Sequence, residues 1–454
     1  MRVGTFESVL SDLTERAAAL QLSDIPTATV QHAALVFADT VGVIMAGNRQ
    51  PELAALLRNS TLLGIQQLST KKPHSVVLSP SYPAAPPTIA AMINGAAATS
   101  LELDEGVRPT GHPAAHIVPA VLAIAQEAGN SGEEVLAAFV SGYEVAARLF
   151  QCLELRGPVH PHGHLGAVGA AVAAARLRRI SPSGAALAAA TVPILGTWEA
   201  CYEGATMRNL YTGFGASSAV AAVEFAASGF TGSLSSLKTF VYRASRGMRN
   251  PEMLTSAIDP TNLRIAKSYF KLHSACSLSH SAIDAVLSMG SLDLSQVRNI
   301  EVETCERAMR LARRSAGNPL SSRFSLPYTV ATAAKHGRAT WDAFSPDPEV
   351  ARLASRVRVR DNPAMTAEWP KRLRARVTIT MVTGEQVCRE VENPLGHASR
   401  RPDPQLLRQK FLELSRSPKS SELYARLVAL ASEKDVYTLF VETSDDGQLG
   451  HNQC

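Results

Sequence analysis

The stretch GPVHPHGHLGAVGAAVAAARL, residues 157–177, predicts the fold because it changes character halfway. Its first half is rich in Gly, Pro and His, and its second half consists mostly of Ala, Gly and Val. Alanine is the strongest helix former, and small side chains let helix backbones approach each other closely. The stretch therefore predicts a tight turn that carries histidines directly into a closely packed helix.

A second stretch, EGVRPTGHPAAHIVP at residues 105–119, has the same organisation, and the segment LELDEG at 101–106 leads into it. Side chains at a turned helix start can converge on a ligand. Carboxylates near imidazoles suit proton transfer close to neutral pH. The two stretches hold five of the twelve histidines and three acids, namely His112, His116, His160, His162, His164, Glu102, Asp104 and Glu105.

The first half of the chain is predicted to be helical. Residues 24–47 carry apolar side chains at three-to-four spacing, with Pro near the start and Gly at the end. Ser131 and Glu134 form a capping-box pattern ahead of another apolar run, and Ser181 opens a further Ala-rich run. The abundance of Ala and Gly indicates helices that pack at close distance.

The pattern changes near residue 265. Residues 296–306 and 372–392 alternate in the two-residue rhythm of strands, the latter with a hairpin turn at Thr383–Gly384. Helical periodicity returns after about residue 400. Clefts between domains are favoured ligand sites. The sequence predicts a mostly α protein in which a large all-helical domain, residues 1–265 plus 400–454, is interrupted by a smaller α+β domain, residues 266–399.

Composition excludes several classes of protein. The 454 residues are enough for two or three domains, and 46% hydrophobic and 19% charged residues are normal for a soluble chain. No secretory signal or unbroken apolar span is visible, so we expect no membrane segment. The net charge of +5 is modest, and Arg clusters at 310–315 and 371–376 are interpreted as solvated surfaces that bind no nucleic acid. Six scattered cysteines without a CxxC pair indicate a reduced compartment, expected to be the cytoplasm, and no phosphate-binding or dinucleotide-binding motif occurs.

Several motifs resemble those of the MmgE/PrpD family, in the same order over nearly the whole chain. LELDEG with GHPAAHIVPAVLAIAQ, SGYEVAARL and HPHGHLGAVGAAVAAARL are similar to the early motifs. EGATMRNLYTGFGA, KLHSACSLSHSAIDAV, NPLSSRFSLPYTVATA and NPLGHASRRP are similar to the later ones. The resemblance implies a large all-helical domain with a small α+β lid, a homodimer, and neither a metal nor an organic cofactor. It also implies small polycarboxylate substrates, with 2-methylcitrate dehydration, cis-aconitate decarboxylation and iminodisuccinate epimerisation as the family's reactions.

The chain departs from the family's pattern at several pocket positions. It has Glu102 for Asp, Gly106 for Thr, Arg208 for Lys, Asn209 for Arg and Tyr211 for His. Cys276 stands where the decarboxylase branch has His and other members have Cys. The matching positions are His112, His160, Lys271 and Tyr328. A retained frame with a changed pocket predicts a changed substrate.

Removing a hydrogen next to a carboxylate requires a base at the carbon and fixed cations or donors at the oxygens. Arg208 offers a two-pronged fork to a carboxylate, so we expect it to hold the substrate. The predicted catalytic residues are His112, Lys271, His160, Glu102, Asp104 and Tyr328, and the predicted substrate-binding residues are Arg208, Cys276 and Tyr211. Which histidine or carboxylate of this set acts as the base stays open.

Structural roles compete with these functional ones. A Gly-His-Pro sequence often caps a helix, as His112 could, and Cys276 could be a small buried hydrophobe. Tyr328 could equally serve core packing. His162 and His164 match no family histidine, and we expect them at the surface or behind the site.

The leading hypothesis is a dehydratase of a 2-methylcitrate-like acid. A cofactor-independent epimerase of an iminodisuccinate-like dicarboxylate is the closest alternative, and a cis-aconitate-type decarboxylase comes third because Cys276 replaces His. Two further classes remain, a non-catalytic polycarboxylate-binding protein and a zinc hydrolase. The spacing in HPAAH and HPHGH permits zinc ligation, but Pro113 places the first pair at a helix start and weakens that geometry.

Overall fold

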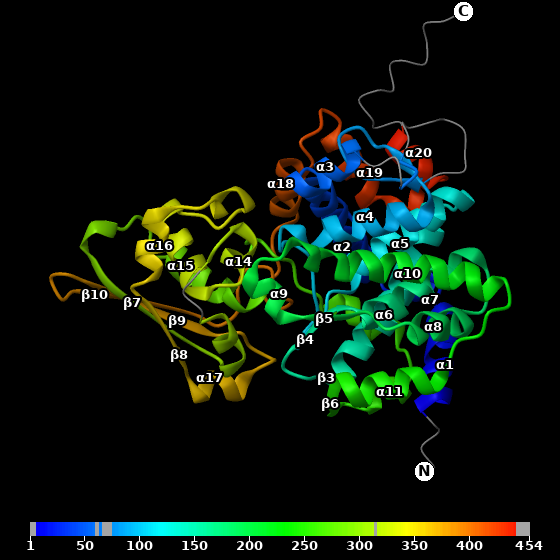
Figure 1. Ribbon diagram of the computed structural model, residues 1–454, viewed down its shortest axis with the longest axis horizontal. Helices are drawn as coiled ribbons and strands as arrows, with labels where there is room; N and C mark the ends of the chain where they lie inside the picture. The colour runs from blue at the N-terminus through cyan, green and yellow to red at the C-terminus, as the bar shows by residue number, and fades with distance from the viewer. Residues whose placement is uncertain (1–5, 60–62, 66–74, 313–315, 442–454) are drawn as a thin grey trace, which may run out of the picture.

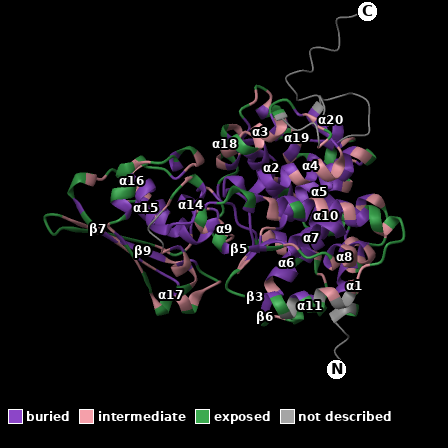
Figure 2. Cartoon of the chain, in the orientation of Figure 1, coloured by how far each residue is buried: buried purple, intermediate pink, exposed green. Residues whose placement is uncertain are grey.

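The computed structural model describes residues 6–59, 63–65, 75–312 and 316–441. The described chain is mostly helical and forms a larger and a smaller body, at the right and the left of Figure 1. Each body has its own buried apolar cluster, and Figure 2 shows the buried residues inside both. The mostly α prediction is confirmed.

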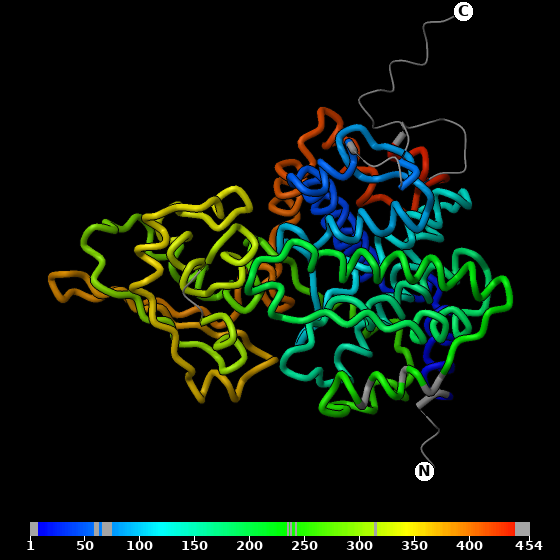
Figure 3. The backbone as a smooth tube through the Cα atoms, in the orientation of Figure 1, coloured from blue at the N-terminus to red at the C-terminus, as the bar shows by residue number. Residues whose placement is uncertain are grey.

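The larger body consists of two sets of helices from distant parts of the chain. The first set is α1 (Phe6–Ala18), α2 (Thr27–Gly47), α3 (Pro51–Asn59), α4 (Pro87–Ser100), α5 (Pro113–Ala128), α6 (Gly132–Cys152), α7 (His164–Arg178), α8 (Pro182–Thr191), α9 (Trp198–Glu203), α10 (Leu210–Ala227), α11 (Leu234–Ala244) and α12 (Glu252–Thr255). The second set is α18 (Pro404–Ser415), α19 (Ser420–Val428) and α20 (Val436–Val441). Figure 3 shows this last segment, in orange and red, beside the blue helices of the N-terminal region.

Helix ends in the larger body follow the predicted signals. The Ser131 side chain accepts from the Glu134 backbone N–H, and the Glu134 side chain accepts from the Ser131 backbone N–H, which completes the capping box of α6. The Ser181 hydroxyl caps α8, and α5 stops at Gly129, whose φ of 73° favours glycine.

Glycines permit the predicted close packing of helices. A Cβ atom on Gly142 of α6 would lie 2.4 Å from the carbonyl oxygen of Gly169 in α7. A Cβ atom on Gly42 of α2 would lie 2.8 Å from the Phe411 ring of α18. The second contact shows how closely α18 packs on α2, because the absent side chain of Gly42 leaves room for the Phe411 ring.

The smaller body contains a four-stranded sheet in the order β10-β9-β7-β8. Its strands are β7 (Val297–Thr304), β8 (Val357–Asp361), β9 (Ala375–Met381) and β10 (Gln386–Val391), and its helices are α13 (His280–Leu287), α14 (Pro319–Arg323), α15 (Leu326–His336), α16 (Pro348–Ala354) and α17 (Pro363–Glu368). Strands β7 and β8 are parallel and the other pairs are antiparallel. The predicted hairpin is confirmed, with Gly384 in its turn at φ 94°.

The larger body is not purely helical, contrary to the sequence expectation. Three two-stranded pairs lie between its helices: β1 (Ser75–Val76) with β2 (Ala84–Ala85), β3 (Leu153–Leu155) with β6 (Ser245–Met248), and β4 (Val159–Gly163) with β5 (Leu195–Thr197). These segments are too short to show an alternating pattern, so the sequence could not reveal them. That the smaller body acts as a lid, and that the boundaries fall at 265 and 400, stay predictions.

One described helix, α2, is long and apolar enough to span a membrane by length and composition alone. Of its most apolar window, 83% is buried inside the larger body. Burial of this kind is typical of a core helix, so the length and composition of α2 are weak evidence for a membrane span.

Candidate functional site

A backbone bridge brings the acidic segment beside the lysine-bearing one. The Gly106 N–H donates to the Tyr269 carbonyl at 3.1 Å, and the Tyr269 N–H donates back at 2.9 Å. A Cβ atom on Gly106 would lie 2.4 Å from the Tyr269 hydroxyl oxygen. The departure at position 106 thus has a structural reason: the tyrosine hydroxyl occupies the space that a threonine side chain would need.

Lys271 joins the two predicted carboxylates. Its Nζ atom donates to Asp104 Oδ1 at 2.9 Å and to Glu102 Oε2 at 3.1 Å. The other oxygen of Glu102 forms an ion pair with Arg208. All four side chains are almost fully buried, so these charges act through a medium of low polarisability and are strongly coupled.

His112, at the N-cap of α5, is oriented by its first ring nitrogen. Its Nδ1 atom lies 2.6 Å from the Glu105 carbonyl oxygen and 2.6 Å from Asp104 Oδ2. Both neighbours are acceptors, so in the neutral ring Nδ1 carries the proton and the lone pair lies on Nε2. The imidazole is therefore held in the tautomer that a general base needs.

Glu105 supports this arrangement from behind. Its carboxylate accepts from the Ala114 N–H and from the Tyr143 hydroxyl, both at 2.7 Å. Burial raises the pKa of Glu105 to about 7, against the lowering effect of these two hydrogen bonds. Burial would also raise the pKa of Asp104, but Lys271 and His112 hold it well below its usual range.

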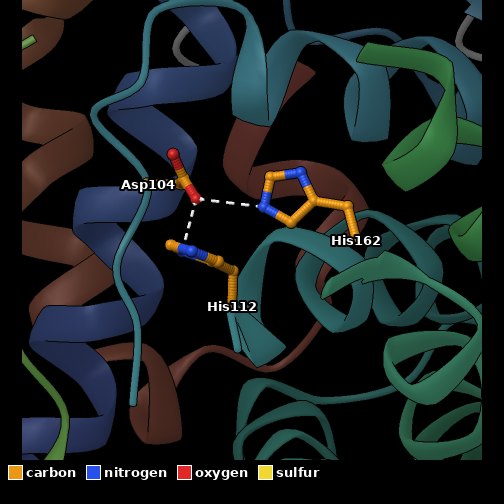
Figure 4. A group of neighbouring side chains, drawn as sticks. All are labelled: Asp104, His112 and His162. Carbon is orange, nitrogen blue, oxygen red and sulfur yellow. Dashed lines mark ion pairs between the residues drawn. The ribbon is translucent and has the colours of Figure 1, made fainter. Parts of the chain in front are cut away.

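Three histidines follow one another in and after β4. The first two, His160 and His162, have ring centroids 4.5 Å apart, and the His162 ring lies 4.8 Å from that of His112. Burial lowers the pKa of His162 to about 4 and that of His160 well below its usual value. At neutral pH His162 is uncharged, so its 3.7 Å approach to Asp104 in Figure 4 becomes an ion pair only on protonation.

The surface role expected for His162 and His164 is wrong, because each is only 2% exposed. His164 packs against the Phe240 ring at 4.0 Å, away from the acids. His116 is also structural: its Nδ1 contacts the His112 carbonyl and its Nε2 accepts from the Gly163 N–H, which ties α5 to the end of β4.

These groups border a cavity of about 40 Å³. Its walls combine side chains of the larger body, the segment around Lys271 and the smaller body, and they include Glu102, Arg108, His112, His160, His162, Trp198, Tyr269, Lys271, Cys276, Arg307, Arg310 and Phe324. Arg108 lies 4.4 Å above the Tyr269 ring and donates to Ser277 at 3.1 Å. Arginines and Lys271 outnumber the carboxylates here, so the cavity favours an anion.

Of the predicted site residues, Glu102, His112, His160, Lys271 and Cys276 line this cavity, and Asp104 and Arg208 touch its charged groups. Tyr211 lies just behind, with its ring 6.0 Å from that of His160. Tyr328 is buried in the apolar cluster of the smaller body and is not among the residues that line the cavity. Roles in catalysis or binding stay predictions for all of them.

Arg208 has an unusual environment. It is 1% exposed, and its Nε and Nη1 atoms have no hydrogen-bond partner among the described residues. Burial, with Arg323 adding repulsion, lowers the pKa of Arg208 to about 9, so the side chain stays charged at neutral pH. Buried guanidinium donors without acceptors are costly. Arg208 is not among the residues that line the cavity, so its contact with the site runs through Glu102.

Asp104, His112 and His162 are also a group that could hold a metal ion, since one ligand atom from each lies within 4.8 Å of the others (Figure 4). Two histidines and a carboxylate are common metal ligands. However, a divalent ion there would lie next to the Lys271 ammonium, and His112 Nδ1 already bears a proton directed at oxygen. The donor set therefore fits proton transfer better than metal binding.

Sequence reasoning missed several lining residues, namely His162, Tyr269, Arg108, Arg307 and Arg310. His162 could have been found, because His160 and His162 are two apart in what proves to be a strand and so share a face. The Arg cluster at 310–315 was interpreted as a solvated surface; Arg310 instead lies in the cavity, and 313–315 lie outside the described residues.

Comparisons with known proteins place the chain in a family. The N-terminal domain of the MmgE/PrpD family matches residues 11–240, and its C-terminal domain matches residues 273–430. Cis-aconitate decarboxylase of Homo sapiens is 33% identical over 104 residues, which is 21% of this chain and 22% of that protein. The Mus musculus protein of the same name is 32% identical over 104 residues, 21% of each chain, so the alignment spans about a fifth of these relatives. Because the two family domains together cover most of its length, the chain belongs to the MmgE/PrpD family.

Proposed function

We propose that this protein removes a proton next to a carboxylate of a small polycarboxylate, and that the reaction is a dehydration of a 2-methylcitrate-like hydroxy acid. The observation that carries the proposal is the chain of contacts from His112 through Asp104 to Lys271 at the edge of an arginine-rich cavity. It supplies a base, a fixed positive charge and anion-binding groups together.

In the proposed reaction, His112 Nε2 takes the proton from the carbon next to the carboxylate. Asp104 stabilises the imidazolium that forms, since its Oδ2 lies beside Nδ1. Lys271 and the neighbouring arginines stabilise the charge that develops on the carboxylate oxygens. The electron pair of the broken C–H bond forms a carbon–carbon double bond as the C–O bond breaks. The leaving hydroxide takes the proton from the His112 imidazolium, which gives water and restores the neutral base.

Decarboxylation is the second candidate, favoured by the similarity to the two proteins named cis-aconitate decarboxylase. In that reaction a carbon–carbon bond breaks, carbon dioxide leaves, and an acid protonates the carbon left behind. The same cationic groups would bind the substrate. Epimerisation differs again, because it needs acid or base groups on both faces of one carbon and no leaving group.

Incubation in deuterated water separates these reactions. The purified full-length protein is given 2-methylcitrate, citrate, cis-aconitate and iminodisuccinate in turn, and products are followed by NMR and ultraviolet absorbance. New alkene absorbance from a hydroxy acid supports dehydration, and carbon dioxide release supports decarboxylation. Deuterium incorporation without either supports epimerisation. Tight binding with no turnover across the panel would indicate a non-catalytic binding protein.

We also propose that the protein is a homodimer. Large apolar side chains are exposed on and near α10 and β5, namely Val192, Leu195, Met207, Phe214, Phe225 and Phe230. A soluble chain rarely exposes that many apolar side chains on neighbouring elements, and a second copy would cover them. Light scattering of the wild type and of Phe214→Glu tests this, since the charge should shift a dimer towards monomer; a monomeric wild type would contradict it.

A further inference from the structure

A second cavity of about 340 Å³ adjoins the cavity of about 40 Å³ that His112 and Lys271 line. We call the larger one the outer cavity and the smaller one the catalytic cavity. Four residues line both cavities: Pro109, Thr110, Arg307 and Arg310. On one side the outer cavity is bounded by β3 and by the segment at the end of β6. On the other it is bounded by the 3-10 helix Glu306–Leu311 and by Thr366 and Trp369 near the end of α17. It therefore lies between the two bodies and leads to the catalytic groups.

The outer cavity is rich in positive charge. Arg246, Arg249, Arg307 and Arg310 line it together with two acids, Glu154 and Glu306. The Arg249 guanidinium forms an ion pair with the Glu154 carboxylate at 3.2 Å, so these two charges cancel. The remaining charges leave a net positive wall facing the catalytic cavity.

Arg307 and Arg310 stand at the junction of the two cavities. Arg310 lies 4.9 Å above the Trp198 ring, and its buried Nε has no hydrogen-bond partner among the described residues. Burial lowers the pKa of Arg307 to about 10, and repulsion from Arg310 and Arg249 adds to the effect. Like charges held together in a partly buried site are destabilising unless an anion binds between them.

The two volumes indicate what that anion is. The catalytic cavity of about 40 Å³ has room for roughly three water molecules, or about one carboxylate group. A substrate with several carboxylates cannot be enclosed there completely, whereas the outer cavity offers space and charge directly beyond it. Resting on the proposed function, we propose that Arg307 and Arg310 bind the distal carboxylate of an extended polycarboxylate whose reacting end lies at His112 and Lys271.

Calorimetric titration with simple acids tests this subsite without knowledge of the substrate. The full-length protein is titrated with succinate, adipate and suberate, and with the monocarboxylates hexanoate and octanoate. The monocarboxylates share the chain length but lack the distal charge. The variants are Arg307→Gln/Arg310→Gln, the charge-preserving Arg307→Lys/Arg310→Lys, and Arg389→Gln as a control that removes an exposed arginine of β10.

We expect the longer dicarboxylates to bind about tenfold or more tightly than succinate and than the matched monocarboxylates, as one charge-assisted contact predicts. This higher affinity for the longer dicarboxylates should vanish in the double Gln variant, persist largely in the double Lys variant and remain unchanged in Arg389→Gln. Equal affinity for long and short dicarboxylates, or an advantage that survives in the folded double Gln variant, would overturn the inference.

The outcome separates the subsite from the proposed function. If succinate binds and Lys271→Met abolishes that binding while chain length has no effect, the polycarboxylate site stands and the outer subsite is wrong. If no dicarboxylate of any length binds to the wild type, both proposals are wrong. Circular dichroism of each variant confirms that it is folded before titration.

Discussion

Asp104 and His112 lie 2.6 Å apart, measured from the carboxylate Oδ2 to the imidazole Nδ1. The other oxygen of Asp104 accepts from Lys271 at 2.9 Å. One carboxylate therefore orients the candidate base and holds the candidate electrostatic group. This arrangement makes the chemistry testable residue by residue.

His112→Asn should lower kcat by about 10² to 10⁴, because the variant lacks the ring nitrogen that accepts the proton. Binding of substrate should change little, since Lys271 and the arginines remain. Steady-state kinetics on the substrate found in the deuterium experiment measures both. His336→Gln, at an exposed position of α15, is the matched control and should behave as wild type. Wild-type turnover by His112→Asn would mean that another group is the base.

Asp104→Asn should destabilise the protein in a manner that depends on pH. The pKa of Asp104 is held well below its usual range in the folded state, so its ionised form stabilises the fold above its unfolded pKa near 4. That stabilisation is lost as the pH falls through the lower folded pKa. Breaking a buried pair costs about 3–5 kcal/mol, so a deficit of that order is expected at pH 7 and a smaller one at pH 3.5.

Urea unfolding followed by circular dichroism at both pH values measures this deficit. Asp12→Asn, which alters an exposed aspartate, should change the free energy of unfolding by well under about 1 kcal/mol at either pH. A deficit for Asp104→Asn that is the same at both pH values would show that its charge is not the source of the effect.

Arg208→Lys restores the residue type usual in the family and keeps the positive charge. A lysine cannot reproduce the two-pronged contact of a guanidinium, so KM should rise about 3–30-fold while kcat changes less. The same comparison with several polycarboxylates should show a shift in preference. An unchanged KM for every substrate would place Arg208 outside the binding set and leave it as a partner of Glu102 alone.

Chelation should leave activity unchanged. A divalent ion among Asp104, His112 and His162 would be repelled by Lys271 and would require loss of the His112 Nδ1 proton. Elemental analysis of the purified protein and assays with and without a chelator check this. Stoichiometric zinc whose removal abolishes turnover would contradict the proton-transfer account and favour metal chemistry.

Local sequence signals predicted the helix boundaries well. The Ser131–Glu134 capping box, the end of α2 at Gly47 and the hairpin turn at Gly384 depend on residues close together in the chain, so their patterns could be interpreted directly. The short strand pairs were missed because β4 and β5 are paired across more than thirty residues and neither has a periodic pattern.

The residues of the candidate site were likewise predicted only in part from the sequence. The resemblance to the family's motifs singled out His112, His160 and Lys271. The burial of His162 and the inclusion of Arg307 and Arg310 in the cavity walls depend on contacts between distant segments. Gly106 shows the difference most clearly. The sequence marks it only as a departure from the family, whereas the fold places the Tyr269 hydroxyl where a larger side chain would stand.

The sequence by itself determined the family, the predominance of helices and the kinds of chemical group available, because these follow from local propensity and from motifs along the chain. Only the tertiary structure decided which of those groups share one cavity and which carry charge there. Charge and proton affinity depend on burial and on partners within a few ångströms, and those partners come from segments more than a hundred residues apart, as Lys271 and Asp104 do.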